Sequence, residues 1–214
     1  MELARKTESL GYGALTMPDH FTDQLAPLPA LTAAAMATST LRIGALVWDN
    51  DYKHPVVFAK EMATLDVLSD GRLDLGIGAG WMITDYEQSG IPYESAGTRI
   101  DKMIEGIDIM KGCFAQGPFS YAGKHYTITN YNGMPKPVQG TCPPILIGGG
   151  GKRVLTYAAK VADIVGINAT MSAGAVGPEA ISTMTADAVD AKVDIVREAS
   201  GDRIADIEMN IRAF

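Results

Sequence analysis

The stretch Ile145-Leu146-Ile147-Gly148-Gly149-Gly150-Gly151-Lys152-Arg153 leads a short apolar run into four consecutive glycines. A run of this kind is typical of a parallel strand that is covered on both faces. Apolar residues with helical spacing follow over 154–162, so a helix is expected there. Strand, glycine turn and helix together make one unit of an α/β protein.

The same alternation extends in both directions along the chain. Further strands are predicted at 14–17, 41–47, 72–78, 144–147, 163–167 and 207–213. Helices are predicted at 2–10, 54–69, 100–114, 154–162 and 178–200. Alternating aromatics and glycines predict a hairpin or loop insertion at about 117–140, within a single domain covering 1–214.

Two architectures fit this order, an open doubly wound sheet or a (β/α)8 barrel of the TIM type. The first would normally carry a dinucleotide fingerprint, but Trp81 stands where its last glycine belongs. A phosphate loop of the Walker type also fails, since Arg153 follows Lys152 where Ser or Thr is required. The pattern favours the barrel, whose functional groups gather at the C-terminal ends of its strands.

Composition excludes several classes of function. The chain of 214 residues has 18 basic and 25 acidic residues, a net charge of −7, which argues against nucleic-acid and anionic-membrane partners. Cys113 and Cys142 have neither the spacing of a zinc site nor the number of a disulfide framework. Asp49-Asn50-Asp51 lacks the remaining ligands of a calcium loop. No metal site is therefore predicted.

Membrane and targeting signals are also not expected. The longest uncharged run, 24–41, is interrupted by Pro27 and Pro29, and the first residues contain no apolar signal segment. With the cysteine usage, this predicts a cytoplasmic protein without membrane partners.

The four glycines at 148–151 have two interpretations. Without side chains the backbone can approach an anion, and free N–H groups at the start of a helix point toward it, so the loop can cradle a phosphate. The alternative is a flexible connection between strand and helix. Gly76 to Gly80, followed by Trp81, can similarly lie against a flat ring or simply allow tight strand–helix packing.

Asp19 and His20 follow the first predicted strand. Histidine exchanges protons near neutrality, and Asp19 can accept a hydrogen bond from a cofactor. The alternative is structural, with Asp19 capping the next segment and His20 packed in a loop.

Taken together, these motifs resemble the luciferase-like monooxygenase superfamily of flavin and deazaflavin barrels. The matching segments are Met17-Pro18-Asp19-His20-Phe21, Leu41-Arg42-Ile43-Gly44, His54-Pro55, Gly71-Arg72-Leu73, Gly78-Ala79-Gly80-Trp81 and residues 144–151. Within the superfamily, the residues around Asp49-Asn50-Asp51 and Asp85-Tyr86 are most similar to proteins that use coenzyme F420. The resemblance implies hydride transfer between reduced F420 and a small organic substrate. An FMN-dependent monooxygenase that uses O2 is the alternative.

The resemblance also implies the site residues. The implied cofactor-binding residues are Asp19, Val47, Gly78, Gly80, Trp81, Thr84, Gly148, Gly149, Gly150 and Gly151. His20 matches a histidine that handles protons in the sugar-phosphate dehydrogenases of the superfamily, and this implies a catalytic role. A cis peptide is expected near Leu46-Val47, forming a bulge behind the ring, and a homodimer is expected as in other members.

Two departures from the family pattern matter. The sugar-phosphate dehydrogenases carry a glutamate where this chain has Trp81, so a sugar-phosphate substrate is disfavoured. The family also has one strand before the first helix and another after the last predicted strand, so an incomplete barrel is expected. A truncated, catalytically inert fragment is therefore a third reading.

Overall fold

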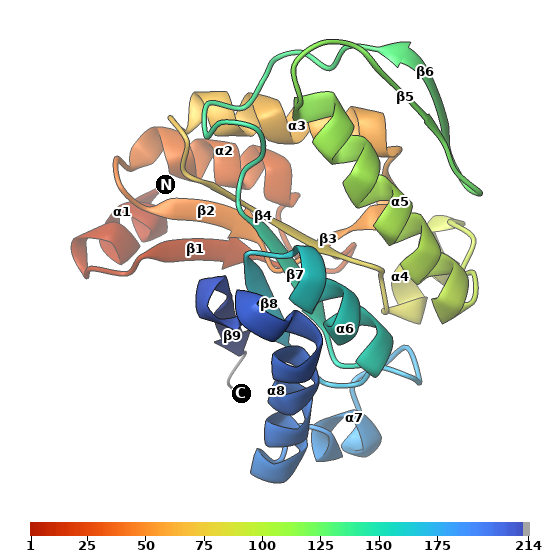
Figure 1. The fold of residues 1–214 in the computed structure, drawn as a ribbon. Helices are drawn as coiled ribbons and strands as arrows, with labels where there is room; N and C mark the ends of the chain where they lie inside the picture. Colours follow the sequence, from red (N-terminus) through yellow and green to blue (C-terminus); the bar gives the residue numbers. More distant parts are fainter. Residues whose placement is uncertain (212–214) are drawn as a thin grey trace.

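A computed structural model describes residues 1–211 and contains a sheet of parallel strands. Its strands are β1 (Ala14–Met17), β2 (Arg42–Ala45), β3 (Trp48–Asp49), β4 (Leu73–Gly78), β7 (Ile145–Gly149), β8 (Ile164–Ile167) and β9 (Glu208–Ile211). They are ordered β1-β2-β4-β7-β8-β9, with β3 also paired to β4. The order follows the chain and the sheet curls (Figure 1), which is the arrangement of a partial TIM-type barrel. The predicted fold class is confirmed.

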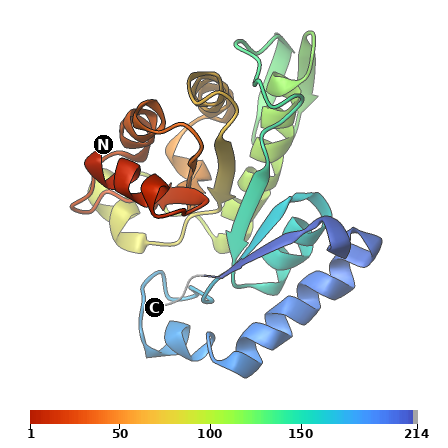
Figure 2. The ribbon, with the colours of Figure 1, turned by 90° about the vertical axis from the view of Figure 1, so that its left-hand side faces the viewer.

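Helices follow most strands and cover the outer face of the sheet (Figures 1 and 2). They are α1 (Glu2–Ser9), α2 (Pro27–Ala37), α3 (Pro55–Leu68), α4 (Ile83–Ser89), α5 (Ala96–Phe114), α6 (Lys152–Val161), α7 (Pro178–Ser182) and α8 (Ala186–Ser200), with short 3-10 turns η1 (Asn50–Tyr52) and η2 (Gly201–Asp206). The sequence did not predict α2 and α4. α2 is apolar almost all round and α4 has only seven residues, so neither shows a clear amphipathic pattern.

The predicted helix over 178–200 is wrong in one respect, because it is two helices. α7 ends at Ser182, and the Thr185 side chain accepts a hydrogen bond from Ala188 N, which starts α8 as a new helix. The predicted strand over 207–213 is found as β9, and residues 212 and 213 lie outside the described residues.

The predicted strand over 41–47 is interrupted. β2 ends at Ala45, the Leu46–Val47 peptide is cis as expected, and β3 begins at Trp48. Gly44 pairs with Asp74 and Trp48 with Ile77, so the β2–β3 side holds one residue more than β4 between the two pairs. This is a β-bulge, and it lies where the resemblance implied one.

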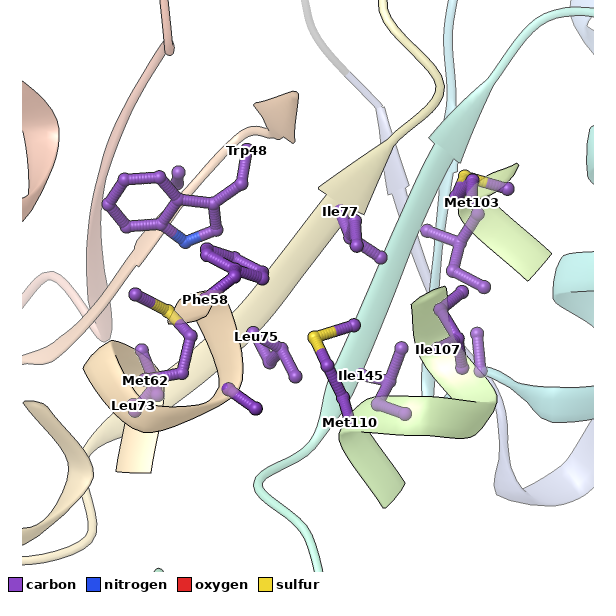
Figure 3. Packing of buried hydrophobic residues seen from close by; sticks show 14 of the residues in the cluster. Trp48, Phe58, Met62, Leu73, Leu75, Ile77, Met103, Ile107, Met110 and Ile145 are labelled. Carbon is purple, nitrogen blue, oxygen red and sulfur yellow. The ribbon is translucent and has the colours of Figure 1, made fainter. Parts of the chain in front are cut away.

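The hydrophobic core lies between the sheet and the helices. Alternate β4 residues Leu73, Leu75 and Ile77 pack against apolar side chains of α3 and α5 (Figure 3). Because successive strand residues point to opposite faces, Asp74, Gly76 and Gly78 lie on the inner face. The outer face thus supplies stability, and the inner face is left with small residues near the C-terminal end of β4.

The predicted hairpin is formed by β5 (Phe119–Ala122) and β6 (Thr127–Tyr131), which pair antiparallel and project beyond the sheet (Figure 1). The Glu105 carboxylate of α5 accepts hydrogen bonds from the backbone N–H groups of Lys124, His125 and Tyr126 and holds the turn. Across residues 1–211, no helix is both long and apolar enough to cross a membrane.

Candidate functional site

The segments that the sequence singled out meet at one rim of the sheet. Met17 of β1 is level with Ala45 of β2, Asp49 of β3 with Gly78 of β4, and Gly149 of β7 with Ile167 of β8. Since these strands are parallel, their C-terminal ends and the loops that follow lie on the same side. The site is described from these loops upward.

His20, in the loop after β1, is paired with a carboxylate. Its Nδ1 lies 2.7 Å from Oδ2 of Asp85, which is only 3% exposed in α4. Tyr52 OH donates to the same oxygen at 3.0 Å, and Phe21 N donates to Oδ1 at 3.3 Å. A carboxylate accepts but does not donate, so His20 carries its proton on Nδ1 and its Nε2 is left to exchange a proton with another group.

The predictions gave Asp85 no role. A signal was present, since Asp85 follows β4 by a few residues, and acids in such loops reach the C-terminal rim. Its partner His20 is 65 positions away in the chain, however, and no local pattern links the two. The side chain of Trp81 completes this corner, edge to face with His20 at 5.3 Å between ring centroids.

A second group of acids lies beside Gly80. Tyr86 OH is 2.9 Å from Oδ2 of Asp49 and 3.3 Å from Oδ2 of Asp51, and Asp51 N donates to Oδ1 of Asp49. Burial raises the pKa of Asp49 to about 7, and it also raises the pKa of Asp51. Between them, Asp49 and Asp51 can therefore hold a proton near neutrality.

Asp19 and Thr84 differ in their surroundings. Oδ2 of Asp19 accepts a hydrogen bond from Asp49 N at 3.2 Å, and burial raises the pKa of Asp19. Asp19 thus ties the end of β1 to β3. Thr84 is exposed on α4, and its side chain makes no hydrogen bond to any described residue, so the structure does not bring it together with Asp19.

Val47 connects three strands on the inner face. Its side chain is the nearest neighbour of the position that a Cβ on Gly78 would take, at 2.6 Å. It also lies 3.3 Å from the corresponding position on Gly148, whose nearest neighbour is Nδ2 of Asn168. Val47, Gly78 and Gly148 are therefore adjacent, and the Asn168 amide, which the sequence did not indicate, lies beside them.

The backbone of Trp81 is held by Tyr93, which packs against the buried cation Arg99. The carbonyl of Trp81 accepts a hydrogen bond from Tyr93 OH, and the guanidinium of Arg99, 5% exposed, lies 4.1 Å from the Tyr93 ring centroid. Arg99 also donates to the carbonyls of Ala79 and Gly80. The turn that carries Gly80 and Trp81 is thus fixed by Arg99 of α5 and by Tyr93, which lies in the segment before α5.

The four glycines at the end of β7 and in the turn that follows it are not equivalent. A Cβ on Gly149 would meet Val154 at 2.5 Å, and one on Gly150 would meet the carbonyl oxygen of Ala169 at 2.3 Å. In the part of the chain that the structure describes, no atom lies within 4 Å of the corresponding position on Gly151. Gly151 is the N-cap of α6, and within residues 1–211 no side chain accepts a hydrogen bond from the first N–H groups of this helix.

This opening has the features of a place where an anion can bind. Backbone N–H groups at a helix start bind anions, and the space beside Gly151 admits one. Lys152 is exposed at the same turn, whereas Arg153 donates to the Gly97 carbonyl and pairs with Asp101 on α5. Of the two cations that could add charge, Lys152 is therefore the one not held by another element.

Comparison with known proteins gives a family. The sequence profile of the family described as "Luciferase-like monooxygenase" matches residues 1–198. An FMNH(2)-dependent dimethylsulfone monooxygenase of Pseudomonas putida is 30% identical over 153 residues, which cover 72% of this chain and 40% of the relative.

Solved structures share the fold. An F420-dependent secondary alcohol dehydrogenase in complex with an F420–acetone adduct matches with a TM-score of 0.79 and 22% identity, covering 98% of this chain and 62% of that one. The long-chain alkane monooxygenase LadA matches with a TM-score of 0.82 and 18% identity, covering 98% and 55%. The chain spans between 40% and 61% of the length of the curated relatives compared with it.

Proposed function

The chain belongs to the luciferase-like monooxygenase family, and from this premise we propose that it transfers a hydride between reduced deazaflavin coenzyme F420 and a small organic substrate. The observation that carries the proposal is the His20–Asp85 pair at the C-terminal rim. Hydride transfer to or from an oxygen-bearing carbon requires a proton to move at that oxygen, and a histidine oriented by a carboxylate is suited to move it.

We propose that Gly148–Gly151 and the first turn of α6 hold the anionic tail of the cofactor. The open space beside Gly151 and the uncapped helix start support this assignment. Three of these glycines differ from Gly151 in what they contribute. The missing side chains of Gly148, Gly149 and Gly150 allow close packing against Val47, Val154 and the segment after β8.

For the ring, we propose Val47, Gly78, Gly80 and Trp81 as its walls. Val47 and Gly78 are in contact on the inner face, and Trp81 stands beside His20. We also propose Asp19 and Thr84 as two separate polar contacts of the ring. F420 supplies a carbon that donates or accepts a hydride, and the residues around it serve to orient this carbon and exclude water.

His20 acts as the proton carrier in this proposal. Asp85 holds Nδ1 protonated, so Nε2 can accept a proton from a substrate hydroxyl or return one to a carbonyl oxygen. Asp85 also stabilises the imidazolium that forms when Nε2 is protonated. Tyr52 and the Phe21 amide hold Asp85 in place.

The test begins with binding and continues with two variants. Titration with F420 should quench its fluorescence, and His20→Gln should retain binding while lowering turnover by about 10²-fold or more. Asp85→Asn should lower turnover by about 10-fold or more at unchanged cofactor affinity.

Asp66→Asn is the matched control. Asp66 is also fully buried and accepts backbone N–H groups, from Val138 and Gln139, but it lies near the C-terminal end of α3, away from the rim. This variant should lose stability and keep its turnover per folded molecule. Equal turnover of Asp85→Asn and wild type would remove the observation on which the proposal rests.

An FMN-dependent monooxygenase using O2 is the second candidate, favoured by the 30% identity to the FMNH(2)-dependent enzyme of Pseudomonas putida. Oxygen uptake with reduced FMN separates the two. An F420 enzyme should be indifferent to oxygen, whereas a monooxygenase should consume it in step with substrate. FMN binding without any response to F420 would replace the first candidate by the second.

We propose a small-molecule substrate, a homodimer, and one barrel domain over 1–214 with the hairpin as an insertion. Sedimentation of the purified protein tests the dimer, because a single monomeric species at micromolar concentration would exclude it.

A further inference from the structure

Lys192, on α8, is a buried cation without a carboxylate partner. It is 6% exposed, and none of the ion pairs among residues 1–211 includes it. Its Nζ donates to the carbonyl oxygens of Asn168 and Thr183, each at 2.7 Å, and lies 3.8 Å from Sδ of Met184. Burying an ammonium without a carboxylate partner is costly, and here the two carbonyl oxygens compensate that cost in part.

The contacts of Lys192 lead to the glycine loop by two routes. The Asn168 carbonyl oxygen that accepts from Lys192 also lies 2.5 Å from the position that a Cβ on Gly150 would take. The same oxygen therefore lies next to Lys192 and next to Gly150. By the second route, Thr170 N donates to Oγ1 of Thr183, and Oγ1 of Thr170 donates to the Gly150 carbonyl at 3.0 Å. Lys192 thus supports the segment that packs against Gly150.

The break between α7 and α8 belongs to the same arrangement. A continuous helix would have placed the Thr183 carbonyl in an internal hydrogen bond. Because α7 ends at Ser182, the Thr183 carbonyl is available to Lys192, and Oγ1 of the same residue accepts from Thr170 N. The departure from the predicted helix therefore provides one of the two carbonyl contacts of Lys192.

We infer that Lys192 is a positioning residue for the phosphate-bearing tail of the cofactor: it fixes the Asn168–Thr170 segment against Gly150 and supplies an uncompensated positive charge behind the glycine loop. The inference rests on the proposed function. Lys192 thus contributes to recognition of the tail without itself reaching the ligand. Binding of the ring does not depend on Lys192.

The charge of Lys192 supports this role physically. Burial lowers its pKa, because the charged form loses hydration. An anion bound at the loop would favour the charged form, and by reciprocity the charged form favours the anion. The interaction passes through a partly buried region, so salt should screen it less than it screens a surface pair.

The experiment compares ring compounds with and without a phosphate. Fluorescence titrations measure the Kd of F420 against its phosphate-free deazaflavin fragment, and of FMN against riboflavin, for wild type and Lys192→Met. We expect the preference for the phosphate-bearing member to fall by about 10-fold or more in the variant, with the Kd of the phosphate-free member changed less than about 3-fold.

Two further variants control the result. Lys160→Met removes the same charge from an exposed position near the end of α6, and it should keep the wild-type preference. Lys192→Gln keeps hydrogen-bond donors and removes the charge, so a partial loss of preference is expected. If Lys192→Met does not fold, Lys192→Gln decides, because an unchanged preference in it would overturn the inference.

The outcomes separate the two proposals. Equal weakening of both members of a pair shows a merely structural role for Lys192 and overturns the inference, as does an unchanged preference in Lys192→Met. Wild type that binds none of the four compounds overturns the proposed function and this inference with it. A second readout uses inorganic phosphate alone, without a ring compound. During this titration the amide resonances of Gly149–Gly151 should shift in wild type and much less in Lys192→Met.

Discussion

Two strand ends in this molecule are rich in glycine, and they use it differently. Within β4, a Cβ on Gly76 would lie 1.9 Å from the Ala45 carbonyl oxygen, and just after β4 one on Gly80 would lie 1.9 Å from Tyr86 OH. At the end of β7, Gly149 and Gly150 are also restricted, but the position beside Gly151 is open in the described chain. A glycine in these loops therefore indicates close packing of the protein against itself more often than room for a ligand.

Gly151, and not Gly149 or Gly150, is the glycine whose substitution tests ligand binding. A bulky residue at Gly149 or Gly150 would displace Val154 or the segment after β8, so lost binding would report a damaged loop. Gly151 adjoins the same helix start without this conflict.

The largest effect is expected for Gly76→Ala. The added methyl must move the backbone of β2 or β4, because its nearest neighbour is a carbonyl oxygen and not a flexible side chain. We expect a loss of at least about 3 kcal/mol in the free energy of unfolding, at the upper end of overpacking costs. Urea denaturation measures it, and a loss below about 1 kcal/mol would show that the two strands adjust easily.

Gly151→Asp should act on binding and leave the fold intact. A carboxylate at the start of α6 would occupy the proposed anion position and repel a phosphate. We expect cofactor affinity to fall by about 10-fold or more, with no loss of thermal stability. Gly13→Asp, an equally open glycine before β1 on the other rim, is the control and should bind as wild type does.

A smaller effect concerns pH and the acids beside Gly80. The pKa of Asp49 rises from 3.8 to about 7 on folding because of burial, so the folded protein keeps a proton that the unfolded chain releases. The folded state is therefore favoured at low pH, and this contribution is lost as the pH rises from about 4 to about 7.

Asp49→Asn isolates this contribution. Between pH 7 and pH 5 the wild type should gain about 2 kcal/mol more stability than the variant, measured by denaturation at each pH. Asp19 and Asp51, whose pKa values burial also raises, contribute with the same sign in both proteins. Parallel pH profiles of the two proteins would contradict a protonated Asp49.

The smallest effect is expected for Gly151→Ala. The backbone of Gly151, with φ −92° and ψ 147°, suits alanine, and the space around it is open. Reduced freedom of the unfolded chain stabilises the variant, while alanine is a poorer N-cap than glycine. We expect the free energy of unfolding to change by less than about 0.5 kcal/mol, and a larger loss would mean that Gly151 is as crowded as Gly76.

Much of the fold could be predicted because its signals are local. Short apolar runs, helical spacing and glycine stops indicated five helices and the parallel strands, and the resemblance to the luciferase-like family implied the cis peptide at Leu46–Val47. The errors have local causes too. α2 is apolar almost all round, and the threonines at 183 and 185 end one helix and start another within a run that keeps helical spacing.

The sequence by itself determined the α/β class, the order of the units and the placing of Asp19, His20, Trp81 and the glycines after strands, since each depends on residues close in the chain. Only the tertiary structure decided that His20 meets Asp85, that Gly151 alone among its neighbours lies open, and that Lys192 donates to the Asn168 carbonyl beside Gly150. These contacts join residues far apart in the chain. They depend on how parallel strands bring their C-terminal ends together, which no local pattern of polarity encodes.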